Sequence, residues 1–254
     1  MGRTKTNLST GAGQGVLVIL LWAAATAVGA TELVANGGFE LNGGANTNTF
    51  TGWTETDQAA GSGSIFAQTG TSSPPPNVIT VPAPPQGTFS AMSSQGGPGS
   101  HILYQNITVP TGASARFSAT VYVNNQAGAF ATPSTLDYTV TPNQQARIDI
   151  MSTGSAVTDV GAGVLLNLYQ TKVGDPLVSG YTAISADLTP FAGQTVRLRI
   201  AEADNQSFFN FGIDQVSVDA NTPVPTLSEW ALIATGLVVL IVGFGALGRR
   251  RVVA

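Results

Sequence analysis

The chemistry open to this chain is limited by a single histidine and by the absence of cysteine. Without cysteine there is no thiol nucleophile and no thiolate zinc site, and a single histidine excludes a metal centre built on two. A Ser-His-Asp triad would depend on His101, which follows the glycine-rich stretch 95–100 and has no nucleophile motif beside it. We interpret His101 as an exposed histidine at a loop-to-strand junction, and we expect that the chain is not an enzyme.

Binding chemistry has more candidates than catalysis. A glycosidase needs two facing carboxylates, and the spacing of the acidic residues singles out no such pair. Sugar binding needs an exposed aromatic ring beside amides or carboxylates, and Phe208-Phe209 is flanked by Asn205, Gln206 and Asn210. Aromatic side chains of a β-sandwich lie in the core more often than on the surface. The other aromatic candidates are Trp53, Tyr104, Tyr122, Tyr138 and Tyr169.

The charge of the central region is more negative than that of the whole chain. Residues 31–222 contain thirteen acidic and five basic residues, a net charge near −8, whereas the full chain has −4. Phosphate binding needs clustered Lys and Arg, so nucleic acid is not an expected partner. Neutral glycans and cations are compatible with this surface.

Alternating residues point to strands in the central region. Apolar residues alternate with polar ones over 116–123 and again over 196–200, which places one face of each strand in a core. In the last such segment the apolar parity changes between Phe209, Phe211, Ile213 and Val216, Val218, so we expect a bulge near Asp214-Gln215. Further predicted strands are 33–36, 87–92, 103–109, 135–141, 146–151, 164–171 and 180–186.

Segments 42–62 and 68–86 are rich in Gly, Asn, Ser, Thr and Pro, and we predict that they are loops. Many short strands and no helical period predict an all-β fold, an antiparallel β-sandwich of the jelly-roll type, over 31–218. A stiff linker is predicted over 219–225.

The two ends of the chain have different compositions from the middle. Residues 1–30 have a basic start, an apolar stretch and small residues before Thr31, which is typical of a secretory signal peptide. Residues 230–248 carry no charge and would span roughly 28 Å as a helix, about the thickness of a bilayer core. The basic cluster Arg249, Arg250 and Arg251 follows and is expected to stay on the cytoplasmic side. We predict a signal helix and a C-terminal transmembrane helix.

The tail resembles a known sorting signal. Its motif comprises Val224, Pro225, Thr226, Leu227, Ser228, Glu229 and Trp230, followed by the apolar span and the arginines. This order, over 224–251, resembles the IPTL-CTERM tails of Gram-negative bacteria, with valine in place of the usual isoleucine. The resemblance implies that an exosortase-type membrane enzyme recognises and removes the tail. The alternative is a permanent single-span anchor.

The body of the chain resembles galactose-binding-like β-sandwiches, which include many carbohydrate-binding modules. The resemblance rests on the stretches 36–40, 52–53, 104–109 and 211–218, which occur here in the order found in those modules. It implies a structural calcium ion near the first and last strands, and the matching carboxylates are Glu40 and Asp214. Calcium takes six to eight oxygen ligands, so backbone carbonyls would complete the shell. The alternative is that both are solvated acids at strand ends.

These features together predict an exported surface or matrix protein. We expect it to be anchored in the cytoplasmic membrane before processing and to reach the cell surface or the medium afterwards. The expected role is adhesive or glycan-binding. The alternative is a structural, self-associating envelope protein with no small ligand.

Overall fold

The computed structural model describes residues 30–222 and 227–250. Its strands range from 2 to 13 residues in length. The elements are β1 (Thr31–Glu32), β2 (Thr54–Asp57), β3 (Ser64–Thr69), β4 (Phe89–Ser94), β5 (Gly99–Thr108), β6 (Ser114–Asn125), β7 (Gln144–Met151), β8 (Val164–Gln170), β9 (Val178–Asp187), the 3-10 helix η1 (Thr189–Phe191), β10 (Thr195–Asp204), β11 (Phe209–Asn221) and α1 (Leu227–Arg250).

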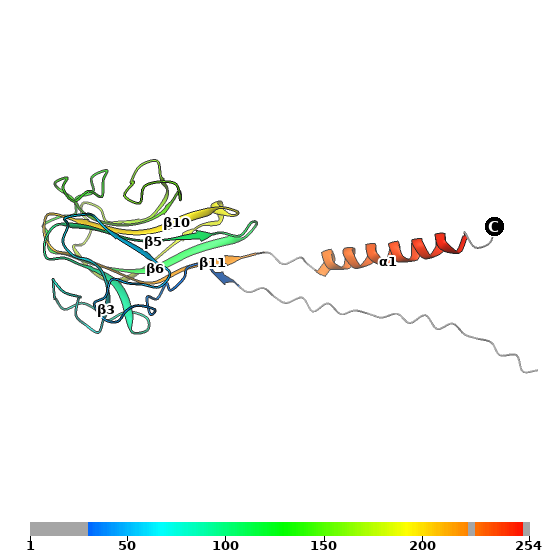
Figure 1. The fold of residues 1–254 in the computed structure, drawn as a ribbon, viewed down its shortest axis with the longest axis horizontal. Coiled ribbons are helices and arrows are strands. Elements are labelled where there is room, and N and C mark those ends of the chain that lie inside the picture. The colour runs from blue at the N-terminus through cyan, green and yellow to red at the C-terminus, as the bar shows by residue number, and fades with distance from the viewer. Residues whose placement is uncertain (1–29, 223–226, 251–254) are drawn as a thin grey trace, which may run out of the picture.

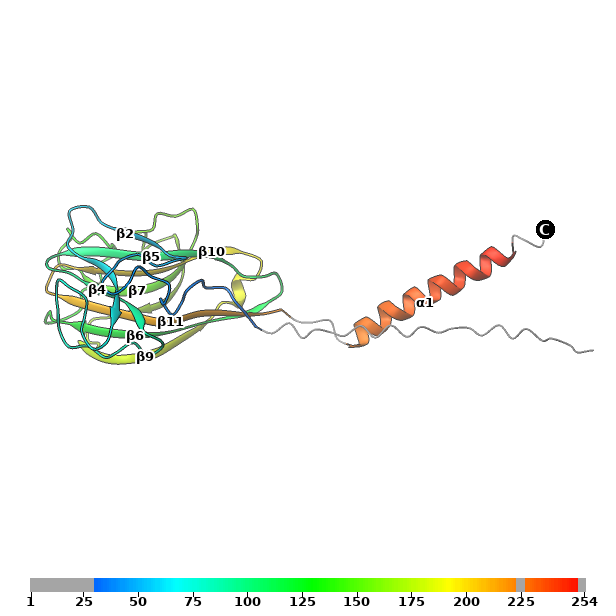
Figure 2. The same cartoon turned by 60° about the horizontal axis from the view of Figure 1, so that its bottom comes forward.

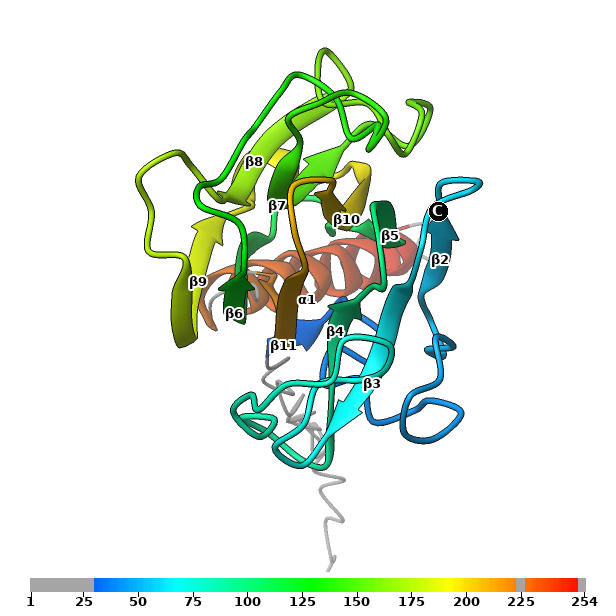
Figure 3. The same ribbon diagram turned by 90° about the vertical axis from the view of Figure 1, so that its left-hand side faces the viewer.

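Two antiparallel sheets form a sandwich, which confirms the predicted all-β class (Figure 1). One sheet has the order β3-β4-β11-β6-β9, with β1 paired to β11, and the other has the order β2-β5-β10-β7-β8. Figure 3 shows the two sheets nearly end-on, and in Figure 2 the strands β6, β11 and β9 lie below β2, β5 and β10. Strands β9 and β8 are therefore outer edges on the same flank of the sandwich.

The core lies between the sheets because alternate residues of each strand point inward. On β10 the inward residues include Val196, Leu198 and Ile200, and they pack against Val121 and Val123 of β6. Every buried member of this cluster lies between Val34 and Ala220, so the sandwich closes its core without the C-terminal helix.

The outer face of the second sheet is covered by loops rather than by solvent. Ile102, Ala201 and Ala203 point outward, and Leu136 and Val157 from two long loops pack onto them. Arg197 and Arg199 point to the same side and donate hydrogen bonds to backbone carbonyls of 153–159. This face therefore carries a second, smaller core and a buried polar layer.

Most predicted strands are confirmed, although β2 and β3 were missed. Both lie in or next to segments assigned to loops on composition. Strand β2 has three exposed residues and one half-buried residue, so it shows no apolar pattern, whereas β3 is mostly buried and pairs with β4. The predicted strand 135–141 is wrong, since these residues form turns that place Leu136 in the outer core. The predicted strand 33–36 is also wrong, because the N-terminal strand is 31–32.

The predicted bulge is confirmed. The pairing between β11 and β6 shifts register between Asp214 and Ser217, and Gln215 takes a positive φ of 54°. The extra residue lets Ile213 and Val216 both point into the core.

The ends of the sandwich differ from the predicted boundaries. Strand β11 extends to Asn221, so 219–221 belong to the sheet and not to a linker. Helix α1 covers the predicted span 230–248, yet over the described residues no helix has the length and apolarity needed to cross a membrane. The predicted transmembrane span is thus not confirmed. The predicted signal peptide lies outside the described residues apart from Ala30, as do Val224, Pro225, Thr226 and Arg251.

Candidate functional site

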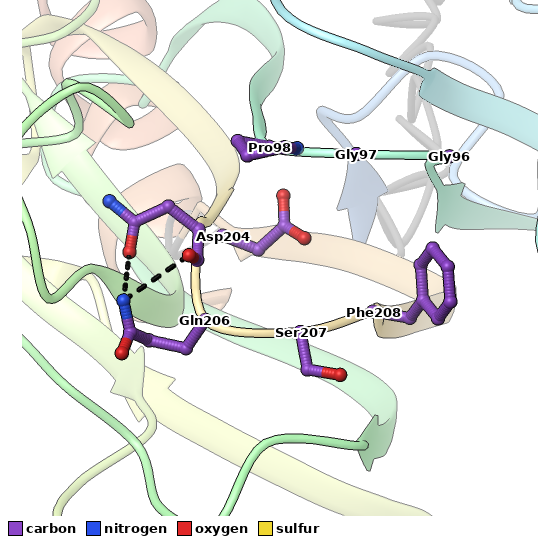
Figure 4. Close-up of a pocket in the computed structure, with 8 residues that line it drawn as sticks. Gly96, Gly97, Pro98, Asp204, Gln206, Ser207 and Phe208 are labelled. Atoms are coloured by element: carbon purple, nitrogen blue, oxygen red, sulfur yellow. Dashed lines mark hydrogen bonds between the residues drawn. The ribbon is translucent and has the colours of Figure 1, made fainter.

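A pocket of about 250 Å³ opens at one end of the sandwich, between the loop 96–98 and the turn that joins β10 to β11. Figure 4 shows Asp204 between these two segments, with the ring of Phe208 on the far side of the opening. The remaining lining residues are Gly96, Gly97, Pro98, Asn205, Gln206 and Ser207. The predicted sugar-contact residues Asn205, Gln206 and Phe208 are therefore brought together.

Buried amides hold the turn that forms one wall of the pocket. The side chain of Gln144, at the start of β7, accepts from the Gln206 amide (3.1 Å) and donates to the Ser207 carbonyl (3.0 Å). Asn205 accepts from the Asn143 amide and donates to the Tyr138 and Val140 carbonyls. Gln144 and Asn143 have no exposed surface, so packing fixes the positions of two groups to which the turn is hydrogen-bonded.

The predicted aromatic pair Phe208-Phe209 is divided between surface and core. Phe209 is buried and packs against Phe130, with ring centroids 5.7 Å apart, whereas Phe208 is 39% exposed. Consecutive residues entering a strand point to opposite sides, which explains the division. Asn210 is buried and bonded to Ser93 and Asn77, so it takes no part in the pocket.

Asp204 forms the base of the pocket and is only 2% exposed. One carboxylate oxygen accepts from the Gly99 amide at 3.0 Å. Burial raises the pKa of Asp204 to about 6, although the Gln95 side chain and the charge of His101 act in the opposite direction. Asp204 therefore changes its charge in a mildly acidic range.

Behind the pocket, acidic residues and the histidine line up across three strands. The register pairs Asp57 of β2 with His101 of β5, and His101 with Glu202 of β10. The His101 Nδ1 atom lies 2.6 Å from the Asp57 carboxylate, and His101 is 1% exposed. The interpretation of His101 as exposed was wrong, because β5 begins at Gly99 and His101 is already between the sheets.

Glu55 and Asp204 complete this group. We call it the acidic cluster, and its members are Glu55, Asp57, His101, Glu202 and Asp204. Glu55 accepts a hydrogen bond from Ser64, and burial and its contact with Asp57 raise the pKa of Glu55 to about 7. Glu202 is fully buried, and neither of its oxygens has a partner in the part of the chain that the structure describes.

The predicted calcium ligands meet at a different place, the turn 86–89. Glu40 accepts from the Thr88 and Phe89 amides, and Asp214 accepts from the Gln86 amide. Asp214 is buried, which raises its pKa to about 6. Within residues 30–222 and 227–250, no three His, Asp or Glu side chains are arranged to hold a metal ion. Backbone carbonyls would have to supply the other ligands.

The other predicted aromatic contacts are mostly structural. Trp53 is buried, stacks on Phe39 and donates to the Asn36 carbonyl. Tyr122 is buried, and Tyr169 stacks on Phe211 with ring centroids 5.9 Å apart. Tyr104 is half-buried beneath the Arg197 guanidinium, and Tyr138 is half-buried over Ala59.

Comparison with known proteins identifies the tail. The model of the IPTL-CTERM motif matches residues 222–251, so this chain carries that sorting motif at its C-terminus. The chain is thus an exported β-sandwich with a C-terminal sorting motif. A comparison with curated proteins finds no match.

Among solved structures, the sandwich is similar to the K3 adhesin domain of Lys-gingipain from Porphyromonas gingivalis, with 13% identity, 76% of this chain and 99% of that chain covered, and a TM-score of 0.45. It is similar to TmCBM61, solved with β-1,4-galactotriose, with 10% identity, 74% and 97% covered, and a TM-score of 0.43. It is also similar to a Stig cyclase from Fischerella sp. TAU, with 14% identity, 77% and 100% covered, and a TM-score of 0.44. These likenesses are distant and assign no function.

Proposed function

We propose that this exported sandwich is an adhesive, glycan-binding protein and that its ligand binds in the pocket beside Phe208. The observation that carries the proposal is one exposed aromatic ring placed beside the amides of Asn205 and Gln206 and the carboxyl group of Asp204. A sugar has an apolar C–H face that packs on a ring and hydroxyl groups that pair with amides and carboxylates. The pocket offers both kinds of contact within one small volume.

The rigidity of the pocket supports a binding role. The turn 205–207 is already held by Asn143 and Gln144 without any ligand. A ligand therefore does not have to order this wall, which reduces the entropic cost of binding.

The position of the pocket suits a protein presented at a surface. Phe208 directly precedes β11, and the sorting motif begins after the other end of that strand. A strand of 13 residues is roughly 40 Å long, so the pocket lies at the end of the sandwich away from the tail attachment.

A glycan array with the purified protein tests the pocket. We expect Phe208→Ala to weaken binding at least tenfold, while Leu165→Ala, which truncates a similarly exposed apolar residue on β8, leaves it unchanged. Equal binding by both variants, or no binding by the wild type, would contradict the proposal. The proposal includes no catalytic step, so hydrolysis of a glycan by the protein would also count against it.

We further propose that an exosortase-type enzyme removes the tail. The sorting motif supports this step, since it combines the residues from Val224 to Trp230 with an apolar stretch and a basic end. Mass spectrometry of the protein recovered from its native cells would show a new C-terminus near the motif. A mature protein that retains Arg249 to Arg251 would instead support the permanent anchor.

A calcium ion held by Glu40 and Asp214 is a separate proposal. Both carboxylates bind backbone amides of the turn 86–89, so an ion there would tie the N-terminal segment to β11. Calcium should raise the melting temperature of the wild type but not of Asp214→Asn. An unchanged wild-type melting temperature would sink this proposal.

Self-association is the second candidate function, and strand β9 favours it. This edge strand has ten residues with no Lys, Arg or Pro, and Val178 at its start is 58% exposed. Long edges without Lys or Pro are sites where strands of other molecules add. Sedimentation that shows concentration-dependent assembly, abolished by Val178→Lys, would favour this function over sugar binding.

A further inference from the structure

The least expected group in the molecule is the carboxyl group of Glu202. It lies between the sheets with no exposed surface, and neither oxygen has a hydrogen-bond partner within the described residues. An isolated carboxylate in such a place is very unfavourable, whereas the protonated acid carries no charge to desolvate. The position thus favours a neutral side chain.

Among the described residues, the one basic neighbour of Glu202 is already paired with another acid. Across the register on β5, His101 places its Nδ1 atom against Asp57. The other ring nitrogen lies close to Gly99, where an added Cβ would be 2.6 Å from it. His101 is therefore oriented toward Asp57, and its second nitrogen has no partner within the described residues.

The remaining neighbours are acidic or uncharged. Strand β2 contributes Glu55 and Asp57, and β10 itself contributes Asp204 on the same face. On the other side of β10 the residue paired with Glu202 is Ala146, and the strands β3 and β4 of the opposite sheet have no charged residue. An ionised Glu202 would therefore face negative charges from two strands.

Glu202 is also close to the pocket through the backbone. Asp204 is two residues along the same strand, so the two side chains point to the same side, and Asp204 forms the base of the pocket. Asp204 accepts a hydrogen bond from the amide of Gly99, which follows the pocket loop 96–98. A charge or water molecule beside Glu202 would therefore disturb both walls of the pocket, the loop 96–98 and the segment 204–208.

We propose that the protonation state of Glu202 controls the packing of this end of the sandwich, and we call this device the latch. With Glu202 neutral, its surroundings between the two sheets stay dry and the pocket keeps its shape. When Glu202 ionises, water enters there and the segments 96–98 and 204–208 loosen. If the pocket binds a glycan as proposed above, binding weakens as the pH rises. The structural change itself does not depend on that function.

The direction in which pH changes the stability follows from the raised pKa of Glu202. Burial, together with the charges of Asp204 and Asp57, raises the pKa of Glu202 well above its usual value. In the unfolded chain this carboxyl group has an ordinary pKa of about 4.3, so it loses its proton at a lower pH than in the folded protein. The stability contributed by Glu202 is thus complete below that value and is lost as the pH rises through the folded pKa.

Urea unfolding and amide NMR of the ligand-free protein between pH 7 and 9 test the latch. Asp204, with a pKa of about 6, is largely ionised throughout this range, and Glu55, with a pKa of about 7, is largely ionised above pH 8. Glu202 therefore dominates the change within the cluster over the upper half of the range. We expect the wild-type midpoint to fall by roughly 0.5 M urea or more. The amide signals of 96–98 and 204–208 should shift or broaden over the same range.

Glu202→Gln, which cannot ionise, should keep its midpoint and its pocket signals constant over this range, and Glu202→Leu should do the same if the glutamine variant folds poorly. The exposed carboxyl change Asp219→Asn should follow the wild type. The proposal is overturned if both Glu202 variants retain the wild-type pH dependence, or if the wild type shows none. A failed glycan array would leave this result unaffected, and the two proposals are thereby separable.

Discussion

Two carboxyl groups with no exposed surface lie on neighbouring strands of the same sheet, and they are surrounded in opposite ways. Asp149 of β7 faces outward, where loops cover the sheet, and Glu202 of β10 faces inward, between the two sheets. Asp149 is paired in register with Arg199, whereas Glu202 is paired with Ala146.

The outward group is fully satisfied. Arg147 donates two hydrogen bonds to Asp149 (2.7 and 2.9 Å), and Arg199 and Asn167 donate one each. Burial acts to raise the pKa of Asp149, but these hydrogen bonds and the two positive charges outweigh it and hold the pKa below its usual value. Arg199 also donates to the carbonyls of Val157 and Asp159, so the ion pairs fasten the covering loop.

The difference teaches that strand parity decides the chemistry of a buried acid here. One residue step along a strand moves a side chain from the face with the arginines to the face without them. A buried acid with charged partners depends on being ionised, while one without them depends on being neutral. Asp149 should therefore lose its stabilising contribution at low pH, and Glu202 should lose its contribution at high pH.

The largest loss in the free energy of unfolding is expected when Asp149 loses its charge. Asp149→Asn leaves Arg147 and Arg199 buried without their counter-charge, and removing one partner of a buried ion pair costs roughly 3–5 kcal/mol. Urea unfolding at pH 7 would measure this loss, with Asp219→Asn as the control. A loss similar to that of the control would show that Asp149 is not essential to this layer.

Acidification should reproduce part of this loss in the wild type. Because the folded pKa of Asp149 is depressed, its stabilising contribution is present above the ordinary value near 3.9 and is lost as the pH falls through the folded value. Unfolding midpoints between pH 5 and pH 2 should fall, and the loop 152–163 should gain hydrogen exchange first. Exchange that begins in the pocket segments instead would contradict this order.

An intermediate effect is expected at the histidine. His101→Gln removes the contact with Asp57, and a hydrogen bond to a charged group contributes about 1.5–3 kcal/mol. Asp57 is partly exposed, so the loss in the free energy of unfolding should lie near the lower value. A stability equal to that of the wild type would mean that the His101–Asp57 contact contributes nothing.

The smallest effect is expected at Asn167, which lies at the edge of the buried polar layer around Asp149. Asn167→Ala removes one hydrogen bond to Asp149 and leaves both arginines in place, so the loss should be about 1 kcal/mol. Leu165→Ala on the same strand provides a comparison for loss of side-chain surface. A loss as large as that of Asp149→Asn would mean that the layer depends on its amide more than on its charges.

The sequence allows the sandwich to be predicted better than its buried acids. The bulge near Asp214-Gln215 follows from a parity change that is visible in the residues, and the structure confirms it. The parity of Val196, Leu198 and Ile200 continues to Glu202 and Asp204, so extending the pattern would have placed both acids inside. Ending that strand at residue 200 hid the signal.

The partners of these acids could not be predicted in the same way. Glu202 meets His101 and Asp57 because of the register of β5 and β2, which is set by contacts distant in sequence. Strand β2 itself was hidden in a segment with the composition of a loop. The pocket residues Asn205, Gln206 and Phe208 were recognisable as candidates, but the buried amides that hold them come from the start of β7.

The most direct test of this account is the ionisation state of Glu202 at neutral pH. Infrared difference spectra between the wild type and Glu202→Gln isolate the carboxyl stretch of this one side chain. The account predicts a protonated carboxyl band at pH 7 that is present in the wild type and absent in the variant. A carboxylate band in its place would show that Glu202 is charged when buried, and would contradict the account.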